Sequence, residues 1–299
     1  MVLIYQSARG HSAVFVTAES AEDSLLIGAQ DTLFMLEAVE GLYDTRAEIY
    51  AIDTAEQAGA LWISSRVKRR VITLEGFILN DVPASRRRLT ACLSPLEPGW
   101  LTLRRTESSG VFERRIRCVV EQGPIFDKTD GSRFTAGLVA PSPWWEDSGS
   151  DSMANLTGWV GAVIFPWSMT EGFQFGGRTP DTAVNVVNPG DVSAGVTIRM
   201  YAAGPVLRPC VNRPGTSDAM LVTTELAQGE SFEINTGVGE KYARYTHADG
   251  SIENGMRYIN PNSTFFQLET CDNLFKAEAE SGAEALTVTM SFRPQYLSV

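Results

Sequence analysis

The chain has 299 residues, a formal net charge of −11 and 43% hydrophobic residues. This length is typical of two domains, and the hydrophobic content is sufficient to bury a sizeable core. No apolar run reaches the roughly 18–20 residues that a membrane span requires, and the start, MVLIYQSARGHS, lacks the basic region and long apolar core of a secretory signal. We therefore expect no membrane insertion and folding in a cytoplasm.

The first sixty residues contain few clear signals. Leu3–Tyr5 and Ala13–Thr17 predict short strands, and a capping-box pattern favours a brief helix within Ala18–Gly28. Thr32–Val39 is apolar enough for either a strand or a helix. The segment from Glu40 to Leu61 has little periodicity, which indicates a loop-rich connection or an extended arm.

The stretch from Leu61 to Leu103 predicts a strand, a helix and a second strand in close succession. Val71–Leu79 is rich in β-branched residues, Asp81 is a plausible helix N-cap, and Pro83 lies where the first turn tolerates proline. A single apolar stripe follows at helical spacing: Leu89, Cys92, Leu93 and Leu96. Pro98-Gly99 then ends the element, and a strand begins at Trp100.

Two further strands and a connector follow this helix. Trp100–Arg105 and Val111–Glu121 are joined by the turn residues 107–110, which is a good hairpin signal. A tight turn at 129–132 precedes a strand at Arg133–Val139. Pro141–Ser152 then has the proline, serine and acidic composition of an exposed connector.

From Met153 onward the sequence is typical of an all-β domain. The predicted strands are short and evenly spaced, and turn residues separate them: Thr182–Val187, Val196–Ala202, Met220–Glu225, Ser231–Asn235, Lys241–Thr246, Thr264–Glu269 and Leu286–Arg293. The last strand alternates apolar and polar residues, as expected for a strand buried on one face. The pattern indicates an antiparallel sandwich or jelly roll.

Charge is unevenly distributed along the chain. Between Trp62 and Cys118 there are 12 Lys or Arg against 5 Asp or Glu, a balance of 12 − 5 = +7, which leaves 13 − 31 = −18 elsewhere. The basic residues include two groups, Lys68, Arg69 and Arg70, and Arg86, Arg87 and Arg88. Such a block is a solvated face, a contact with the acidic surface of another copy, or a nucleic-acid patch. The overall negative charge argues against general nucleic-acid binding.

The sequence does not single out a catalytic or metal site. The four cysteines are scattered without C-x-x-C spacing, which favours isolated thiols over two long-range disulfides. Two histidines, His11 and His247, are available, and His247 lies in a predicted hairpin tip. Ser65 to Lys68 fits S-x-x-K without its companion motifs, and no P-loop, G-x-S-x-G or H-E-x-x-H is present. We expect no enzymatic activity, no metal and no cofactor.

Several of these segments resemble the N-terminal domain of siphophage distal tail proteins (Dit). The matching residues are Arg70, Ile72, Leu74, Gly76 and Ile78 of an R-x-I-x-L-x-G-x-I strand, then Arg86–Arg88, Leu93, Pro95 and Gly99, and finally Arg133–Leu138 and Ala140–Trp145. The resemblance covers Glu40–Asp147. It implies a split-barrel-like β domain with one helix, followed by a galectin-like antiparallel β-sandwich. The expected division is 1–145 for the ring-forming domain, 146–152 for the linker and 153–299 for the sandwich.

The resemblance also implies a function in a virus particle. Proteins of this family form hexameric rings that connect the tail tube protein to the tail-tip hub, or tail-associated protein, and hold receptor-binding proteins. On this reading the chain is a virion tail-tip component assembled in the bacterial cytoplasm, with DNA only as passing cargo. Lys68, Arg69, Arg70 and Arg86–Arg88 are then the candidates for the contact between subunits.

A carbohydrate-binding module or carbohydrate-active enzyme is the alternative. Jelly rolls often bind glycans, and the adjacent Trp144 and Trp145 could stack on sugar rings. Such a pair more often packs a linker onto its own domain or onto a neighbour. The sequence does not decide between these readings, nor does it specify the neighbouring proteins or the type of tail.

Overall fold

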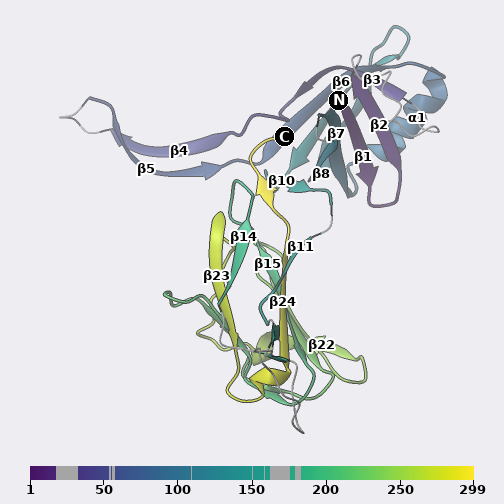
Figure 1. Cartoon of the computed structure of the whole chain (residues 1–299). Helices are drawn as coiled ribbons and strands as arrows, with labels where there is room; N and C mark the ends of the chain where they lie inside the picture. The colour runs from purple at the N-terminus through teal and green to yellow at the C-terminus, as the bar shows by residue number, and fades with distance from the viewer. Residues whose placement is uncertain are drawn as a thin grey trace. The chain divides into compact units, whose positions relative to one another are not determined.

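The computed structural model describes residues 1–17, 33–53, 55, 58–108, 110–149, 151–157, 159–161, 176–178 and 183–299. These residues form two compact units, the first made of Met1–Gly149 with Tyr296–Val299 and the second of Ser150–Gln295 (Figure 1). Strands dominate both units, and the described part of the chain contains one α-helix. The prediction of a mainly β fold with a single helix is confirmed. The helix expected within Ala18–Gly28 lies outside the described residues.

A closed seven-stranded barrel forms the body of the first unit. The strands follow the order β8-β7-β1-β2-β3-β6-β9, and β9 pairs back with β8 to close the barrel. The pairs are antiparallel except β2 with β3, which run parallel. The strand bounds are β1 Val2–Ser7, β2 Ser12–Thr17, β3 Leu33–Glu40, β6 Arg70–Ile78, β7 Pro98–Glu107, β8 Gly110–Phe126 and β9 Arg133–Ala140, and the short strands β10 Trp145–Asp147 and β25 Gln295–Tyr296 extend the sheet beyond β8.

The barrel interior is filled by alternate residues of each strand. In β6 the buried residues include Ile72, Leu74 and Ile78, which alternate with more exposed neighbours, and the strand predicted from the β-branched run Val71–Leu79 is confirmed. Gly76 interrupts this row because the neighbouring strand β3 lies too close for a side chain at this position. A Cβ atom at Gly76 would lie 2.1 Å from the carbonyl oxygen of Met35. A bulge in β3 between Leu36 and Ala38 accompanies this approach.

The helix α1 (Val82–Cys92) packs against the barrel through Leu89 and Cys92. Asp81 caps its start, since the Asp81 carboxylate accepts a hydrogen bond from the Ala84 N–H at 3.4 Å. The predicted apolar stripe is correct as far as Leu93, but Leu96 is 82% exposed because the helix ends at Cys92. Pro95 explains the early end: it lacks an N–H and disfavours helical backbone at the preceding residue.

A two-stranded hairpin leaves the barrel between β3 and β6. Its strands are β4 (Ala47–Asp53) and β5 (Ala60–Val67), and they pair with each other and with no other strand among the described residues. Figure 1 shows them as a long ribbon that projects from the first unit. We call this hairpin the arm. The sequence reading of a loop-rich connection is wrong here, and its second reading, an extended arm, is confirmed.

The second unit is a sandwich of two antiparallel sheets. Val186 and Phe275 of one sheet share a hydrophobic core with Ile198 and Met290 of the other. One sheet has the order β11 (Ser152–Asn155), β24 (Leu286–Phe292), β15 (Val196–Ala202), β20 (Ser231–Asn235), β21 (Tyr242–Thr246), β22 (Ile252–Asn254), and the other β14 (Val184–Asn188), β23 (Cys271–Glu278), β17 (Cys210–Asn212), β18 (Ala219–Leu221). Smaller elements are the pairs β12 (Trp159–Gly161) with β13 (Gly176–Arg178) and β16 (Val206–Leu207) with β19 (Glu225–Leu226), and the 3-10 helices η2 (Gly255–Tyr258) and η3 (Ala283–Ala285).

This unit differs from the prediction in several places. The segment Met220–Glu225, predicted as one strand, is divided between β18 and β19, and β17 and β22 were not predicted. Thr264–Glu269 forms no strand and contributes an isolated bridge between Leu268 and Ala194. Strand β23 was not predicted because Asn273 occupies a buried position in it. The Asn273 side chain donates to the carbonyls of Glu269 and Cys271 at 2.8 and 3.0 Å, so an inward-facing polar residue hides the alternation.

Candidate functional site

The arm carries large apolar side chains that contact no other part of the described chain closely enough to be buried. Ile49 is 68% exposed, Leu61 64% and Trp62 63%, and Tyr50, Ile52 and Ile63 are also exposed. An isolated two-stranded hairpin is at best marginally stable in water, and a contiguous exposed apolar patch marks an interaction surface. The arm is therefore the strongest candidate functional site of the molecule.

Buried Arg70 holds the base of the arm. Its guanidinium lies at the start of β6 with 4% of the residue exposed. It donates hydrogen bonds to six oxygens: the carbonyls of Gly41, Leu42, Asp44, Pro143 and Leu297 at 2.6–3.0 Å and the hydroxyl of Thr45 at 3.3 Å. These acceptors belong to the chain entering the arm, to the exit from the barrel and to the last residues of the protein. One guanidinium thus joins three separate segments.

Burial lowers the pKa of Arg70, while neighbouring Asp44 favours the charged form. The hydrogen-bond donors of the Arg70 guanidinium are thus occupied by five main-chain oxygens and one hydroxyl. Arginine suits this role because its planar fork presents five N–H donors in fixed directions.

Two backbone features complete the base of the arm. Gly41 has φ +84°, and a Cβ atom there would lie 1.9 Å from the carbonyl oxygen of Val71, so the chain can enter the arm only through a glycine. Where the two strands meet the barrel, the Lys68 N–H donates to the carbonyl oxygen of Arg46 at 2.8 Å. The arm therefore leaves a rigid base.

A small cavity of about 170 Å³ opens beside this base. It is lined by Asp44, Thr45, Arg46, Lys68, Arg69, Arg70, Val71 and Pro143. Lys68 and Arg69 are exposed there and face carboxylates, Lys68 that of Glu48 at 4.0 Å and Arg69 that of Glu121 at 3.6 Å. Three of the six predicted contact residues thus gather at the arm, two on the surface and one buried beneath it.

The other three predicted residues lie on α1. Arg86 stacks over the ring of Phe126 at 4.6 Å from its centroid, and Arg88 donates to the carbonyl oxygen of Ser12 at 3.4 Å. Arg86 and Arg87 are exposed, and Arg88 is half-buried. The structure therefore divides the two basic groups between the base of the arm and the helix.

Carboxylates accompany three further arginines of the basic block. Arg104 pairs with Glu113 at 2.7 Å, Arg105 with Glu107 at 2.7 Å, and Arg115 with Glu146 at 3.8 Å. Arg115 also lies over the ring of Trp100, 4.2 Å from its centroid. Internal pairing of this kind leaves few cations free to neutralise phosphates, so this surface is poorly suited to binding nucleic acid.

The two adjacent tryptophans have different environments. Trp145 is fully buried in the barrel core, and its indole N–H donates to the carbonyl oxygen of Leu42 at 3.2 Å. Trp144 is half-buried. Trp145 thus has no ring face available for stacking on a sugar, and its position ties the exit of the barrel to the segment that enters the arm.

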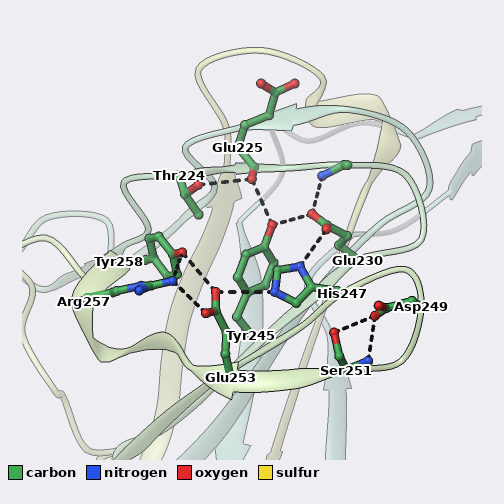
Figure 2. A network of polar contacts seen from close by, with 11 residues as sticks. Thr224, Glu225, Glu230, Tyr245, His247, Asp249, Ser251, Glu253, Arg257 and Tyr258 are labelled. Carbon is green, nitrogen blue, oxygen red and sulfur yellow. Dashed lines mark hydrogen bonds and ion pairs between the residues drawn. The ribbon is translucent and has the colours of Figure 1, made fainter.

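A network of polar side chains surrounds His247 in the second unit (Figure 2). Its Nδ1 atom lies 3.2 Å from Glu230 Oε1 and its Nε2 atom 3.5 Å from Glu253 Oε1. Tyr245 donates its hydroxyl hydrogen to Glu230, and Tyr258 donates to Glu253 at 3.0 Å. Both ring nitrogens of His247 face carboxylate oxygens, an arrangement that an imidazolium satisfies with two donors.

This network cross-links the turns that it joins. Glu230 precedes β20, His247 follows β21 at the hairpin tip predicted from the sequence, and Glu253 belongs to β22. Each of these side chains is bound to another member, and Arg257 is paired with Glu253 at 2.7 Å. The network contains no activated nucleophile, and we assign it a structural role.

Among the described residues, no group of three or more His, Cys, Asp or Glu side chains is placed to hold a metal ion. No helix in the described part of the chain is long and apolar enough to cross a membrane. Cys92, Cys118, Cys210 and Cys271 are free thiols. Burial raises the pKa of Cys92 to about 12 and that of Cys210 to about 11, so these thiols are poor nucleophiles.

Sequence reasoning did not find the apolar character of the arm. The signal was present in the segments AEIYAID and ALWISSRV, which are rich in apolar residues. These residues do not alternate with polar ones, and no Asn-Gly or Asp-Gly pair marks the turn. A segment that is apolar without period two does not identify itself as a strand.

No protein-family model matches the chain, and no curated protein matches its sequence. Solved structures do match its fold. The Dit protein of phage SPP1, a paradigm of the hub adsorption apparatus in phages that infect Gram-positive bacteria, aligns with a TM-score of 0.64 at 15% identity, over 88% of this chain and 94% of that chain. A chain of the phage p2 baseplate, in its activated conformation with strontium, aligns with a TM-score of 0.50 at 10% identity, over 100% and 99% of the two chains.

Proposed function

We propose, from the premise that this chain has the fold of the SPP1 Dit protein, that it is a structural component of a phage tail tip. The likeness spans both units, and the chain accounts for 94% of the length of that protein. The second unit, which we interpret as a galectin-like sandwich, belongs to the same likeness. Enzymatic activity is not part of the proposal.

The tail-tip component would act as a closed ring of six copies. Such a ring would connect the tail tube protein to the tail-tip hub and hold receptor-binding proteins, with DNA as passing cargo. A ring needs a heterologous contact, in which a surface of one copy binds a different surface of the next. The observation that carries this proposal is the arm, because its exposed apolar residues on a fixed base form a contact surface that no other element in the described part of the chain covers.

The predicted basic residues would contribute to the same contact. Lys68 and Arg69 lie beside the base of the arm, where an arm and a neighbouring subunit would meet. Arg86 and Arg87 offer exposed charges on α1 to the acidic surface of another copy. Reversing the charge of Arg86, Arg87 and Arg88 together should weaken the ring, and an unchanged oligomer would remove α1 from the contact.

The mass of the native particle tests the ring. Size-exclusion chromatography with light scattering should give about 196 kDa, six copies of a 32.6 kDa chain in a closed cyclic assembly. Negative-stain images of the same peak should show a ring with a central hole. A peak at the mass of one chain over a wide range of protein concentration would contradict the proposal.

A further inference from the structure

The last four residues of the sequence, Tyr296–Val299, belong to the first unit although they follow the second unit in the chain. We call them the strap. The guanidinium carbon of Arg114 lies 3.5 Å from the centroid of the Tyr296 ring, and Arg114 also donates a hydrogen bond to the carbonyl oxygen of Ser298. The side chains of Tyr296 and Val299 pack against the hydrophobic core of the barrel. The strap is therefore held on the barrel at both of its ends.

One carbonyl group of the strap joins the two chain segments that form the base of the arm. The carbonyl oxygen of Leu297 accepts a hydrogen bond from the Thr45 hydroxyl at 3.0 Å and another from the Arg70 guanidinium at 2.6 Å. Thr45 lies in the segment that leads into β4, whereas Arg70 begins β6, shortly after the chain has left the arm. The strap therefore links the point where the chain enters the arm to the point where it leaves.

The second unit determines where the chain returns to the barrel. Within that unit, the carbonyl oxygen of Gln295 accepts a hydrogen bond from the Asp191 N–H at 2.9 Å. Strand β25, which begins the strap, pairs with β10, the strand after which the chain leaves the barrel. Without a folded second unit, binding of the strap would have to close a flexible loop of roughly 150 residues, which lowers its equilibrium constant by a factor on the order of 10³.

We propose that the strap is a conformational device that fixes the base of the arm only when the second unit is folded. In the fixed state, the Leu297 carbonyl is the shared acceptor of Thr45 and Arg70. When the second unit is unfolded, the strap dissociates, both donors lose this acceptor, and the base of the arm opens more often. One consequence rests on the proposed function: a chain with an unfolded second unit presents a loose arm and is kept out of the ring.

Hydrogen exchange at the Lys68 amide measures the state of the base, because this N–H donates to the carbonyl oxygen of Arg46 where the arm meets the barrel. All chains carry Ile52→Glu, a change at an exposed position of β4, so that contacts between copies do not add to the protection. Removal of residues 297–299 should accelerate exchange at Lys68 by about tenfold, as expected for the loss of two hydrogen bonds. An unchanged rate would overturn the inference.

A matched pair of point variants isolates the hydroxyl contact. Thr45→Val removes the hydroxyl that donates to Leu297 and should accelerate exchange at Lys68 roughly threefold. Thr90→Val is the control, because it removes a hydroxyl that donates to the carbonyl oxygen of Arg86 at 2.9 Å, on α1. Exchange at Lys68 should be unchanged in the control. Equal acceleration by the two variants would contradict a specific contact between the strap and the arm.

Phe232→Asp tests the dependence on the second unit. Phe232 is fully buried in the core of that unit, so a carboxylate at this position should unfold it, with exchange in β15 and β24 as the measure of unfolding. Exchange at Lys68 should then match that of the chain without 297–299, while the amides of β1 and β7 stay protected. Slow exchange at Lys68, or loss of protection throughout β1 and β7, would overturn the inference. A wild-type chain that forms no ring would contradict the proposed function and leave these results unaffected.

Discussion

Arg70 shows how much a single side chain can organise. Its hydrogen bonds run to the entry of the arm, to Pro143 and to Leu297, residues that are far apart in the sequence. The motif that suggested a resemblance to distal tail proteins begins at this residue, so the sequence pattern marks a structural centre. Its neighbours Lys68 and Arg69 point to solvent and have a different chemistry.

Replacing Arg70 with methionine should destabilise the first unit by at least about 3 kcal/mol, because removing the buried guanidinium takes a hydrogen-bond donor from six oxygens, most of them partly buried main-chain carbonyls. Arg69→Met is the matched control. It removes an exposed ion pair with Glu121, worth at most about 1 kcal/mol. The measurement is urea unfolding followed by circular dichroism, and equal midpoints for the two variants would contradict this account of Arg70.

The carboxyl group of Glu230 should make the stability of the second unit depend on pH. Burial alone would raise the pKa of this carboxyl group, but hydrogen bonds from Tyr245 and the Ala227 N–H, together with His247, bring the pKa below its usual 4.5. A lowered pKa in the folded state means that the ionised carboxylate stabilises the fold above pH 4.5. That contribution is lost as the pH falls through the lower folded value.

Wild-type protein should therefore lose more thermal stability than Glu230→Gln when the pH is lowered from 5 towards 3. Substituting the exposed Glu284 with glutamine is the control and should leave the wild-type slope unchanged. The measurement is the midpoint temperature of thermal unfolding of each protein at several pH values across this range. Parallel curves for wild type and Glu230→Gln would show that the network does not hold the turns of the second unit.

At the scale of elements, the arm has two parts with different roles. Its base is fixed by Arg70, by Gly41 and by the bond from Lys68 to Arg46, whereas its outer half, 49–52 with 61–63, carries apolar side chains that are exposed among the described residues. Rigidity at the base reduces the entropy lost when the outer half binds. The direction of the arm is thus fixed before any binding, whereas its apolar residues remain exposed.

Replacing residues 48–66 with a short Gly-Ser loop should leave the barrel folded, because the arm contributes no residue to the barrel core. We expect the thermal midpoint of the first unit to change by at most a few degrees, while the assembly becomes monomeric. Calorimetry and light scattering on the same sample measure the two effects. A barrel that unfolds on removal of the arm would show that the arm is part of its fold.

Elements with regular alternation could be predicted from the sequence, and interrupted ones could not. Strands β15 and β20 have the predicted bounds, and β24 has the predicted buried face, because each buries one face against the core. In the arm, both faces are apolar and the bulge at Ile63 breaks the period, so no pattern of period two exists to be read. In β23, the buried amide of Asn273 donates to the nearby carbonyls of Glu269 and Cys271 and, at 3.4 Å, to the sequence-distant carbonyl of Val186.

The same limit applies to the candidate site. Clustering of basic residues could be predicted from Lys68–Arg70, but the sequence cannot separate the buried Arg70 from its exposed neighbours. Burial there depends on Leu42, Pro143 and Leu297, which tertiary folding brings together. The strand motif located the right region, and the contacts within it required the structure.

At the scale of the whole molecule, the electrostatics disfavour retention of DNA. The net charge is −11, and Arg104, Arg105 and Arg115 of β7 and β8 are paired with carboxylates of the same chain. We expect no shift of duplex DNA in a gel assay at about 150 mM salt. Changing Glu107, Glu113 and Glu146 together to glutamine should release three cations and produce a salt-sensitive shift. Retention of DNA by the wild-type protein would contradict this interpretation.

The return of the last four residues to the first unit makes the second unit an insertion. The chain leaves the barrel after β10, builds the sandwich, and comes back as β25, which pairs with β10. Leu297 then binds Arg70, and Ser298 accepts a hydrogen bond from Arg114. Departure and return therefore lie on adjacent strands. A cassette bounded in this way can be enlarged, exchanged or removed during evolution without breaking a barrel strand, so the two halves of such a protein are free to diverge at different rates.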